Sequence, residues 1–250
     1  MSSERQLFES ESRWWGEHIH RYKEALVYTQ SGRVILDIAC GTGFGTDILA
    51  QHSTGDVYGG DIDAGAIQEC QANWKRANIH FKVMDGTRLD FSNEYFDAIV
   101  SFETIEHTTE YKKMVAEFFR VLKPGGYLIV STPNAKITSP DGVIENRYHT
   151  QEFTSEQLQT LLGGFFNELS IYGQRYKRYD NRSVKNTLGK FFETVFLSFG
   201  IRKLPYSLRN SIMNLFFGYN LYPVDKDFVL EKDLMIINKN CPVLFAVCKK

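Results

Sequence analysis

A glycine-rich stretch followed by two acidic residues is the part of this sequence best suited to holding a ligand. The stretch reads ILDIACGTGFG over residues 35–45 and places glycine at positions 41, 43 and 45. Glycine permits a tight turn and lets backbone N–H groups approach a ligand closely. Asp61 lies twenty residues after Gly41, and Asp85 follows in the segment MDGT. We expect Asp61 to accept hydrogen bonds from ribose hydroxyls and Asp85 to accept one from an adenine amino group.

The glycine spacing separates this loop from the two common phosphate-binding loops. A dinucleotide-binding loop has the pattern GxGxxG, whereas this loop has GxGxG and follows Asp37, which disfavours a pyrophosphate. A P-loop needs Gly-Lys-Ser or Gly-Lys-Thr, and neither follows here. The remaining alternative is a tight turn without a ligand. The acidic residues at the next two expected strand ends argue against it.

Two histidines and a neighbouring carboxylate are candidates for proton transfer. Glu106 and His107 occur in FETIEH, and His149 occurs in NRYHTQEF. Imidazole titrates near neutral pH, so it suits removal of a proton from a hydroxyl or amine. We predict His149 as the general base and His107 as the second choice. The alternatives are a loop-capping role for His107, a surface position for His149 and a loop-ordering role for Glu106.

The sequence predicts no metal site and a reducing compartment. No cluster of Asp and Asn typical of a magnesium site stands out, and the histidines lack the spacing of zinc ligands. The four cysteines form no CxxC pair and are expected to be small buried residues. The polar N-terminus does not resemble a signal peptide, and no apolar run is long enough to span a bilayer. We therefore expect a cytoplasmic protein, with a peripheral position at the inner face of the membrane as a further option.

Segments with strand and helix patterns alternate through most of the chain. Strands are expected over 33–39, 56–61, 80–84, 96–102, 127–132, 166–172 and 243–248, and helices over 4–29, 46–51, 64–77, 111–122 and 155–162, with a turn at KPGG and a loop over 134–154. This alternation predicts an α/β, Rossmann-like fold with a seven-stranded, mostly parallel sheet and helices on both faces. Ligands bind such sheets at the carboxyl ends of the strands, where the glycine loop and the acidic residues fall.

Five segments in this order resemble the successive motifs of the class I S-adenosylmethionine-dependent methyltransferases. They are ILDIACGTGFG, YGGDID, VMDGT, FDAIVSFETIEH and RVLKPGGYLIVSTPN, and the resemblance covers about residues 20–170. Within this family the segments are most similar to methyltransferase type 11, the branch that includes ubiquinone- and sugar-modifying enzymes. The segments HIHRY over 18–22 and NRYHTQEF over 146–153 also resemble a bacterial subgroup associated with surface glycans.

The resemblance implies S-adenosylmethionine as cofactor, S-adenosylhomocysteine as product, and specific contacts for each part of the cofactor. For the methionine part it implies contacts from Ala39, Cys40, Gly41 and Gly43, and for the ribose a contact from Asp61. The adenine would be bound by Ile62, Asp85 and Gly86. Below the sulfonium it implies Ser101, Phe102 and Glu103, and from the N-terminal helix Arg21 and Tyr22. Asp37 is implied to order the loop. The expected acceptor contacts are Glu106, Asn134, Arg147, Tyr148, Arg175 and Arg178.

Residues 173–225 do not match this pattern and are predicted to be a basic, aromatic-rich helical insertion. The methyltransferase domain is then expected over 1–172 and 226–250. Residues 173–214 contain nine Lys or Arg and two acidic residues, which gives this segment a net charge of +7 in a chain whose total is −1. The insertion is expected either to pack as a helical cap or to act as a substrate lid that meets a membrane surface through 184–217.

The expected reaction is in-line methyl transfer to a hydroxyl or amine of a small molecule, first of all a sugar or glycan. The acceptor could be linked to a nucleotide or lipid carrier, whose negative charge would suit the basic residues. A quinone-like or lipid precursor is the alternative acceptor. A non-catalytic scaffold that binds the cofactor is the alternative function. The sequence shows no recognised nucleic-acid-binding module.

Overall fold

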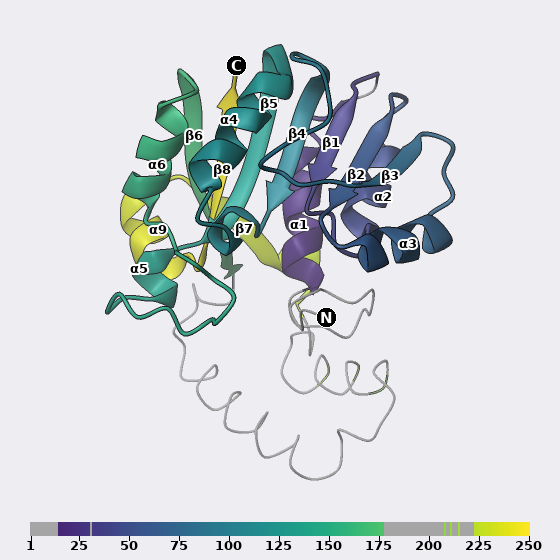
Figure 1. Cartoon of the computed structure of the whole chain (residues 1–250). Helices are drawn as coiled ribbons and strands as arrows, with labels where there is room; N and C mark the ends of the chain where they lie inside the picture. Colours follow the sequence, from purple (N-terminus) through teal and green to yellow (C-terminus); the bar gives the residue numbers. More distant parts are fainter. Residues whose placement is uncertain (1–14, 31, 178–207, 209–210, 212–214, 216–222) are drawn as a thin grey trace. The chain divides into compact units, whose positions relative to one another are not determined.

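The computed structural model describes residues 15–30, 32–177, 208, 211, 215 and 223–250 (Figure 1). The described residues divide into a larger unit, made of 21–175 and 230–250, and a smaller one that includes 15–20, 176–177 and 223–229. The predicted insertion over 173–225 begins inside strand β6, which spans Glu168–Tyr176. The rest of it, including Arg178, lies outside the described residues except for a few positions.

The described strands form one mixed sheet in the order β3-β2-β1-β4-β5-β8-β6-β7. Their bounds are β1 Ile35–Ile38, β2 Val57–Asp61, β3 Ile79–Val83, β4 Phe96–Phe102, β5 Leu122–Pro133, β6 Glu168–Tyr176, β7 Phe228–Glu231 and β8 Val243–Lys249. The first five strands are parallel to one another, and β8 runs antiparallel to both β5 and β6. The strand order reverses between β1 and β4, which is where α/β sheets bind ligands.

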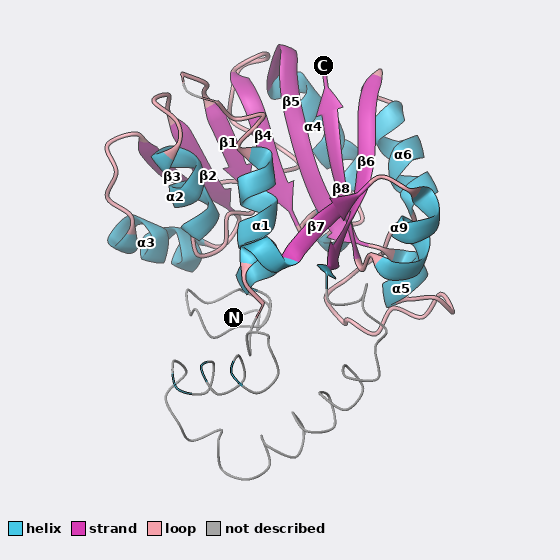
Figure 2. Ribbon diagram, turned by 180° about the vertical axis from the view of Figure 1, so that it is seen from behind, coloured by secondary structure: helices cyan, strands magenta, loops and turns pink. Residues whose placement is uncertain are grey.

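The helices cover both faces of this sheet. They are α1 Trp15–Ala25, α2 Phe44–Gln51, α3 Ala64–Asn73, α4 Tyr111–Val121, α5 Ala135–Thr138, α6 Ser155–Gly163 and α9 Leu234–Asn240, with short 3₁₀ turns η1 Ile105–His107 and η4 Asp225–Asp227. Figures 1 and 2 show α4 and α6 on one face and α2 on the other. Helix α2 connects β1 to β2, and α4 connects β4 to β5, so the two connections cross the sheet in opposite directions. Because such connections are right-handed, the two helices lie on opposite faces.

The main core lies between the central strands and the helices α4 and α6. Leu36, Ile99 and Leu128 come from three neighbouring strands, and Phe118 and Leu158 come from the two helices. All five side chains are completely buried. Because these strands are covered on both faces, they consist of almost continuous apolar runs. The parallel part of the sheet is thereby a rigid support for the loops at its carboxyl edge.

The structure confirms the predicted α/β fold and changes it in detail. The described sheet has eight strands where seven were predicted, because the four-residue β7 adds an edge strand. The predicted turn at KPGG lies inside β5, where the pairing with β4 is irregular and Gly125 has a φ of 76°. The short α5 occupies the start of the predicted loop, and α9 was not predicted.

Two predicted helices have different ends. Helix α3 stops at Asn73 instead of Ala77, because Trp74 has an extended backbone and its indole N–H donates to the carbonyl oxygen of Thr42 at 2.8 Å. The N-terminal helix, predicted over 4–29, spans Trp15–Ala25, and its first predicted turns lie outside the described residues. In the described part of the chain no helix is long and apolar enough to cross a membrane.

Candidate functional site

The glycine loop joins β1 to α2 through backbone conformations that few side chains tolerate. Ala39, Gly41 and Gly43 all have positive φ, at 62°, 56° and 77°. A Cβ at Gly43 would lie 2.8 Å from the Cys70 sulfur, so this side of the loop is packed against the protein. A Cβ at Gly41 would meet no heavy atom within 4 Å. The loop therefore has a closed inner side and an open side at Gly41 that a ligand can approach.

Asp37, in β1 just before the glycine loop, connects the loop to the surrounding protein through hydrogen bonds. Its two carboxylate oxygens accept hydrogen bonds from the hydroxyls of Tyr22 at 3.0 Å and Thr46 at 2.6 Å. Burial raises the pKa of Asp37 to about 6, although both hydrogen bonds favour the ionised form. The Tyr22 ring lies against α2 at Gly45, where an added Cβ would lie 1.8 Å from a ring carbon. This geometry matches the loop-ordering role expected of Asp37 and gives the Tyr22 hydroxyl an internal partner.

Asp61, at the end of β2, is tied to the same loop. One carboxylate oxygen accepts the Gly41 N–H at 3.0 Å, and the other accepts the Asp63 N–H at 2.9 Å. The neighbouring Ile62 is 72% exposed, which is unusual for a large apolar side chain beside a polar site. A carboxylate fixed by backbone donors next to an exposed apolar surface suits a ribose and the face of an adenine.

Asp85 and Gly86 follow β3 in a turn that the aspartate itself stabilises. The Oδ1 atom of Asp85 accepts both the backbone N–H and the hydroxyl of Thr87, each at 2.8 Å. Gly86 approaches Met114 closely, since an added Cβ would lie 3.1 Å from the methionine methyl group. The turn is thus rigid, and it belongs to the same edge of the sheet as Asp61.

The end of β4 brings three more of the predicted cofactor residues to this edge. Ser101 and Phe102 are buried, and Glu103 has a φ of 50°. Glu103 accepts a hydrogen bond from the Ser131 hydroxyl at 2.7 Å, and Arg21 lies 4.0 Å from the same oxygen. Arg21 is almost completely buried and donates to the Gln174 side chain at 2.7 Å. Arg21 thus links the N-terminal helix to the strand end.

The positions of these residues fit the predicted cofactor, because they lie together at one edge of the sheet. The ends of β1, β2, β3 and β4 are adjacent in the sheet, and Ala39, Asp61, Asp85 and Glu103 lie at those ends or within two residues after them. The loop is open at Gly41, where an added Cβ would meet no heavy atom within 4 Å. When bound, S-adenosylmethionine supplies an electrophilic methyl group on a positively charged sulfur.

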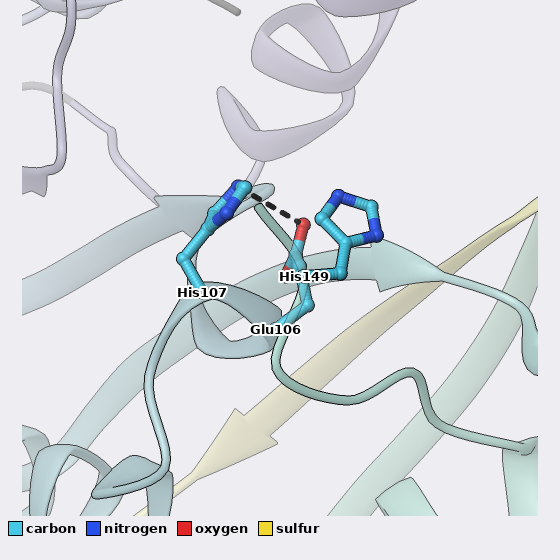
Figure 3. Close-up of side chains that lie close together, drawn as sticks. All are labelled: Glu106, His107 and His149. Atoms are coloured by element: carbon cyan, nitrogen blue, oxygen red, sulfur yellow. Dashed lines mark ion pairs between the residues drawn. The ribbon is translucent and has the colours of Figure 1, made fainter. Parts of the chain in front are cut away.

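Glu106, His107 and His149 form a compact cluster beyond this edge (Figure 3). One ligand-type atom from each residue lies within 4.8 Å of the others. Glu106 is completely buried, and its Oε1 atom lies 3.9 Å from Nε2 of His107. Burial, together with the nearby Glu103 carboxylate, raises the pKa of Glu106 well above the usual value. The sequence identified all three residues singly, and the fold brings them together.

The two histidines are held by different partners. Nδ1 of His107 donates to the Tyr148 carbonyl oxygen at 3.1 Å, and Nδ1 of His149 donates to Glu152 at 2.8 Å. Nε2 of His149 accepts from the Asn146 side chain at 2.9 Å. Burial alone would raise the pKa of Glu152, but hydrogen bonds from Thr138, His149 and Ser139 hold it below the usual value. Both ring nitrogens of His149, the first-choice base, are therefore engaged within the protein.

Other predicted acceptor residues are engaged elsewhere. Asn134 is fully buried, and its amide donates to the carbonyl oxygens of Ile237 and Cys241 at 3.0 and 2.9 Å. Arg175 is buried and forms an ion pair with Glu231. These contacts indicate structural roles. Arg147 lies over the ring of Tyr148, 4.7 Å from its centroid, on the loop that also carries His149.

Sequence reasoning did not single out Asn146 and Glu152 as partners of His149. Both residues stand three positions from His149, within the segment NRYHTQEF that the sequence had marked only as a resemblance. Glu152 also lines a separate cleft of about 650 Å³ between α4 and α6, together with Tyr111, Phe153 and Leu161. That cleft contains none of the predicted cofactor residues, so we place the chemistry at the strand ends.

Comparison with known proteins supports a methyltransferase assignment for the central part of the chain. Residues 36–130 match the family model described as a methyltransferase domain. Over 153 residues the chain is 33% identical to a probable S-adenosylmethionine-dependent methyltransferase from Mycolicibacterium smegmatis, covering 61% of this chain and 58% of that protein. Over 115 residues it is 30% identical to a phthiotriol/phenolphthiotriol dimycocerosates methyltransferase from Mycobacterium ulcerans, covering 45% and 42% of the two chains.

The matches leave part of these relatives uncovered, because the chain spans about half of their length. The fold has a fuller counterpart among solved structures. An S-adenosylmethionine-dependent methyltransferase from Archaeoglobus fulgidus superposes with a TM-score of 0.62 at 16% identity, covering 96% of this chain and 95% of that one. The fold is thus the α/β, Rossmann-like methyltransferase fold with a mixed, mostly parallel sheet.

Proposed function

We propose that this chain, whose residues 36–130 match a methyltransferase domain, is a class I S-adenosylmethionine-dependent methyltransferase that transfers a methyl group to a hydroxyl or amine of a small molecule. The observation that carries the proposal is the placement of two groups of residues. The predicted cofactor residues and the Glu106–His107–His149 cluster both follow strand ends at the carboxyl edge of the sheet. A donor and an acceptor bound there would meet above the end of β4.

The proposed roles of the donor residues follow from their contacts. Gly41 offers an open backbone surface for the methionine part, and Asp61 accepts hydrogen bonds from the ribose hydroxyls. Ile62 packs on the adenine, whose amino group donates to Asp85. Glu103, whose carboxylate accepts a hydrogen bond from Ser131, is proposed to lie below the positive sulfonium. These contacts align the methyl group, which is the main requirement for an in-line displacement.

The acceptor loses a proton during the reaction, and the structure favours His107 over His149 as the residue that takes it. In the transfer a bond forms from the acceptor atom to the methyl carbon, while the carbon–sulfur bond breaks and its electron pair stays on sulfur. The Tyr148 carbonyl fixes the proton of His107 on Nδ1, so Nε2 carries the lone pair. The side chain of His107 is 35% exposed, whereas that of His149 is 11% exposed and its Nε2 accepts a hydrogen bond from Asn146. We assign the base to His107 and an orienting role to His149.

The acceptor is proposed to be a lipid or a lipid-linked molecule rather than a free sugar. The Mycobacterium ulcerans relative is named for a dimycocerosate, a lipid. The positive charge of residues 173–214 suits an anionic carrier or membrane surface. We propose residues 173–225 as the segment that approaches this acceptor, and residues 1–172 with 226–250 as the cofactor-binding domain.

Transfer of a labelled methyl group tests this function. The full chain is incubated with S-adenosylmethionine labelled in the methyl group and with lipid alcohols, quinone precursors, nucleotide sugars and glycans in separate reactions. The expected result is label in the lipid or quinone fraction. Label in the sugar fractions would contradict the lipid assignment. Tight cofactor binding without transfer to any fraction would support the alternative of a non-catalytic scaffold.

A further inference from the structure

We propose that Glu106, His107 and His149 bind a divalent metal ion of the zinc, manganese or iron(II) type. The expectation from the sequence was that no metal is bound, because the histidines lack the spacing of zinc ligands and no magnesium-type cluster of Asp and Asn stands out. The structure places one ligand atom from each residue within 4.8 Å of the others. Two imidazoles and one carboxylate are a donor set that suits these ions and leaves further coordination positions open.

One oxygen of the buried Glu106 carboxylate has no hydrogen-bond partner among the described residues and could bind a positive ion. Its Oε2 atom accepts a hydrogen bond from the Thr132 hydroxyl at 2.9 Å. Its Oε1 atom is buried and has no hydrogen-bond partner among the described residues. A buried acceptor without a partner is costly. Oε1 faces Nε2 of His107 at 3.9 Å, a separation that leaves room for an ion to bridge the two atoms (Figure 3).

The two histidines are oriented as metal ligands usually are. A metal-binding imidazole commonly donates its second ring N–H to a carboxylate or a backbone carbonyl, which fixes the lone pair on the other nitrogen. His107 donates from Nδ1 to the Tyr148 carbonyl, and His149 donates from Nδ1 to Glu152. Both lone pairs are therefore on Nε2. Glu152 in turn accepts hydrogen bonds from the hydroxyls of Thr138 and Ser139, which fix the carboxylate that orients His149.

Binding requires only a small closure of the cluster. Bonds of about 2.0–2.2 Å from zinc to nitrogen or oxygen place neighbouring ligand atoms roughly 3–3.6 Å apart. The three atoms must therefore approach by about 1 Å, and the Asn146 amide must leave Nε2 of His149. The loop is already anchored beside the carboxylate, because the Thr150 N–H donates to the Glu106 carbonyl oxygen at 2.8 Å.

The catalytic consequence, unlike the binding itself, rests on the proposed function. An acceptor hydroxyl would fill an open coordination position, and the positive charge would lower its pKa. Nε2 of His107 would then be a ligand instead of the base, and the proton would pass to solvent. Metal dependence of the transfer therefore distinguishes activation by the ion from proton removal by His107.

Titration of the chelator-treated full chain with Co²⁺ and Zn²⁺ tests the metal site. We expect one ion per chain, with visible Co²⁺ absorption bands, and a rise in melting temperature with Zn²⁺. His107→Ala and His149→Ala are expected to weaken binding about tenfold or more. Glu106→Gln should do the same, and the two histidine variants decide the matter if this buried variant fails to fold. His52→Ala, at an exposed histidine at the end of α2, is the matched control and should bind like the parent.

Two results would overturn the proposal. One is the absence of stoichiometric binding to the folded parent chain. The other is binding that His107→Ala and His149→Ala leave unchanged, which would place the ion elsewhere. Because both are measured without cofactor or acceptor, they do not depend on methyl transfer. Adding a chelator to the labelled-methyl reaction then tests the catalytic consequence separately.

Discussion

At the scale of single residues, two aspartates act on the same glycine loop from opposite sides. Asp61 accepts the Gly41 N–H on the open side, next to the exposed Ile62. Asp37 is buried on the inner side and accepts two hydroxyl hydrogen bonds. The first is placed to meet a ligand, and the second to support the loop. Substitutions at the two positions should therefore affect different properties.

Asp61→Ala should mainly weaken cofactor binding. The loss of charge-assisted hydrogen bonds to the ribose costs roughly 1.5–3 kcal/mol, which corresponds to a rise in Kd of about tenfold or more. Isothermal titration with S-adenosylhomocysteine measures this change. Asp63→Ala is the matched control, because Asp63 caps α3 by accepting the Gly65 and Ala66 N–H groups. The control should lose about 1 kcal/mol of stability and keep its affinity. Equal affinities for Asp61→Ala and the parent would remove Asp61 from the site.

Asp37→Asn should change how stability depends on pH. The pKa of Asp37 is raised to about 6 by burial, so the folded protein holds this proton more tightly than the unfolded chain does. The contribution of Asp37 to the free energy of unfolding therefore falls as the pH rises from about 4 to about 6. The loss is roughly 2 kcal/mol between about pH 4.5 and 7.5. Urea unfolding at the two pH values should show this loss in the parent and not in the variant. Identical pH slopes would contradict the assignment.

At the scale of elements, the sequence predicted the parallel strands well and the acceptor side poorly. Strands β1 and β4 are almost continuous apolar runs of the kind that a doubly covered sheet buries, interrupted by Asp37 in β1 and by Asp97 and Ser101 in β4. Strand β7 was missed because FVLE is four residues long and lies between charged residues. The Glu106–His107–His149 cluster depends on a loop folding back over η1, and contacts between residues about 40 positions apart leave no periodic pattern in the sequence.

Gly45→Ala should destabilise the contact between the loop, α2 and Tyr22. The new methyl group would lie 1.8 Å from the Tyr22 ring, so the ring or the helix must shift. Overpacking of this kind costs about 1–3 kcal/mol or more. Gly163→Ala is the control, because Gly163 ends α6 and a Cβ there meets no heavy atom within 4 Å. That variant should be neutral or gain up to about 1 kcal/mol. Thermal unfolding measures both, and equal melting temperatures would contradict the packing described for Tyr22.

At the scale of the whole molecule, charge is distributed unevenly along the chain. Residues 173–214 carry a net charge of +7, which leaves about −8 on the remainder of a chain with a total of −1. Clustered positive charge draws a protein toward anionic lipid surfaces, and each basic residue near the surface contributes about 1 kcal/mol. The proposed lipid acceptor would be found at such a surface.

The basic segment should bind vesicles that contain anionic lipid. We expect co-sedimentation with phosphatidylserine vesicles at low salt and its loss at high salt, because salt screens the attraction. Replacing the adjacent Arg202 and Lys203 with Gln should weaken binding. The same change at the adjacent Lys112 and Lys113 on α4 should not. Equal binding of both variants, or equal binding to neutral vesicles, would show that the segment is not the contact.

Direct binding of the demethylated product tests whether the strand ends hold S-adenosylmethionine, and it does so without knowledge of the acceptor. Isothermal titration of the folded chain with S-adenosylhomocysteine should show a single saturable site that Asp61→Ala weakens about tenfold or more. The product is the right probe because it makes the same ribose and adenine contacts and is not consumed. Absence of binding to the folded parent chain would contradict the account at its base.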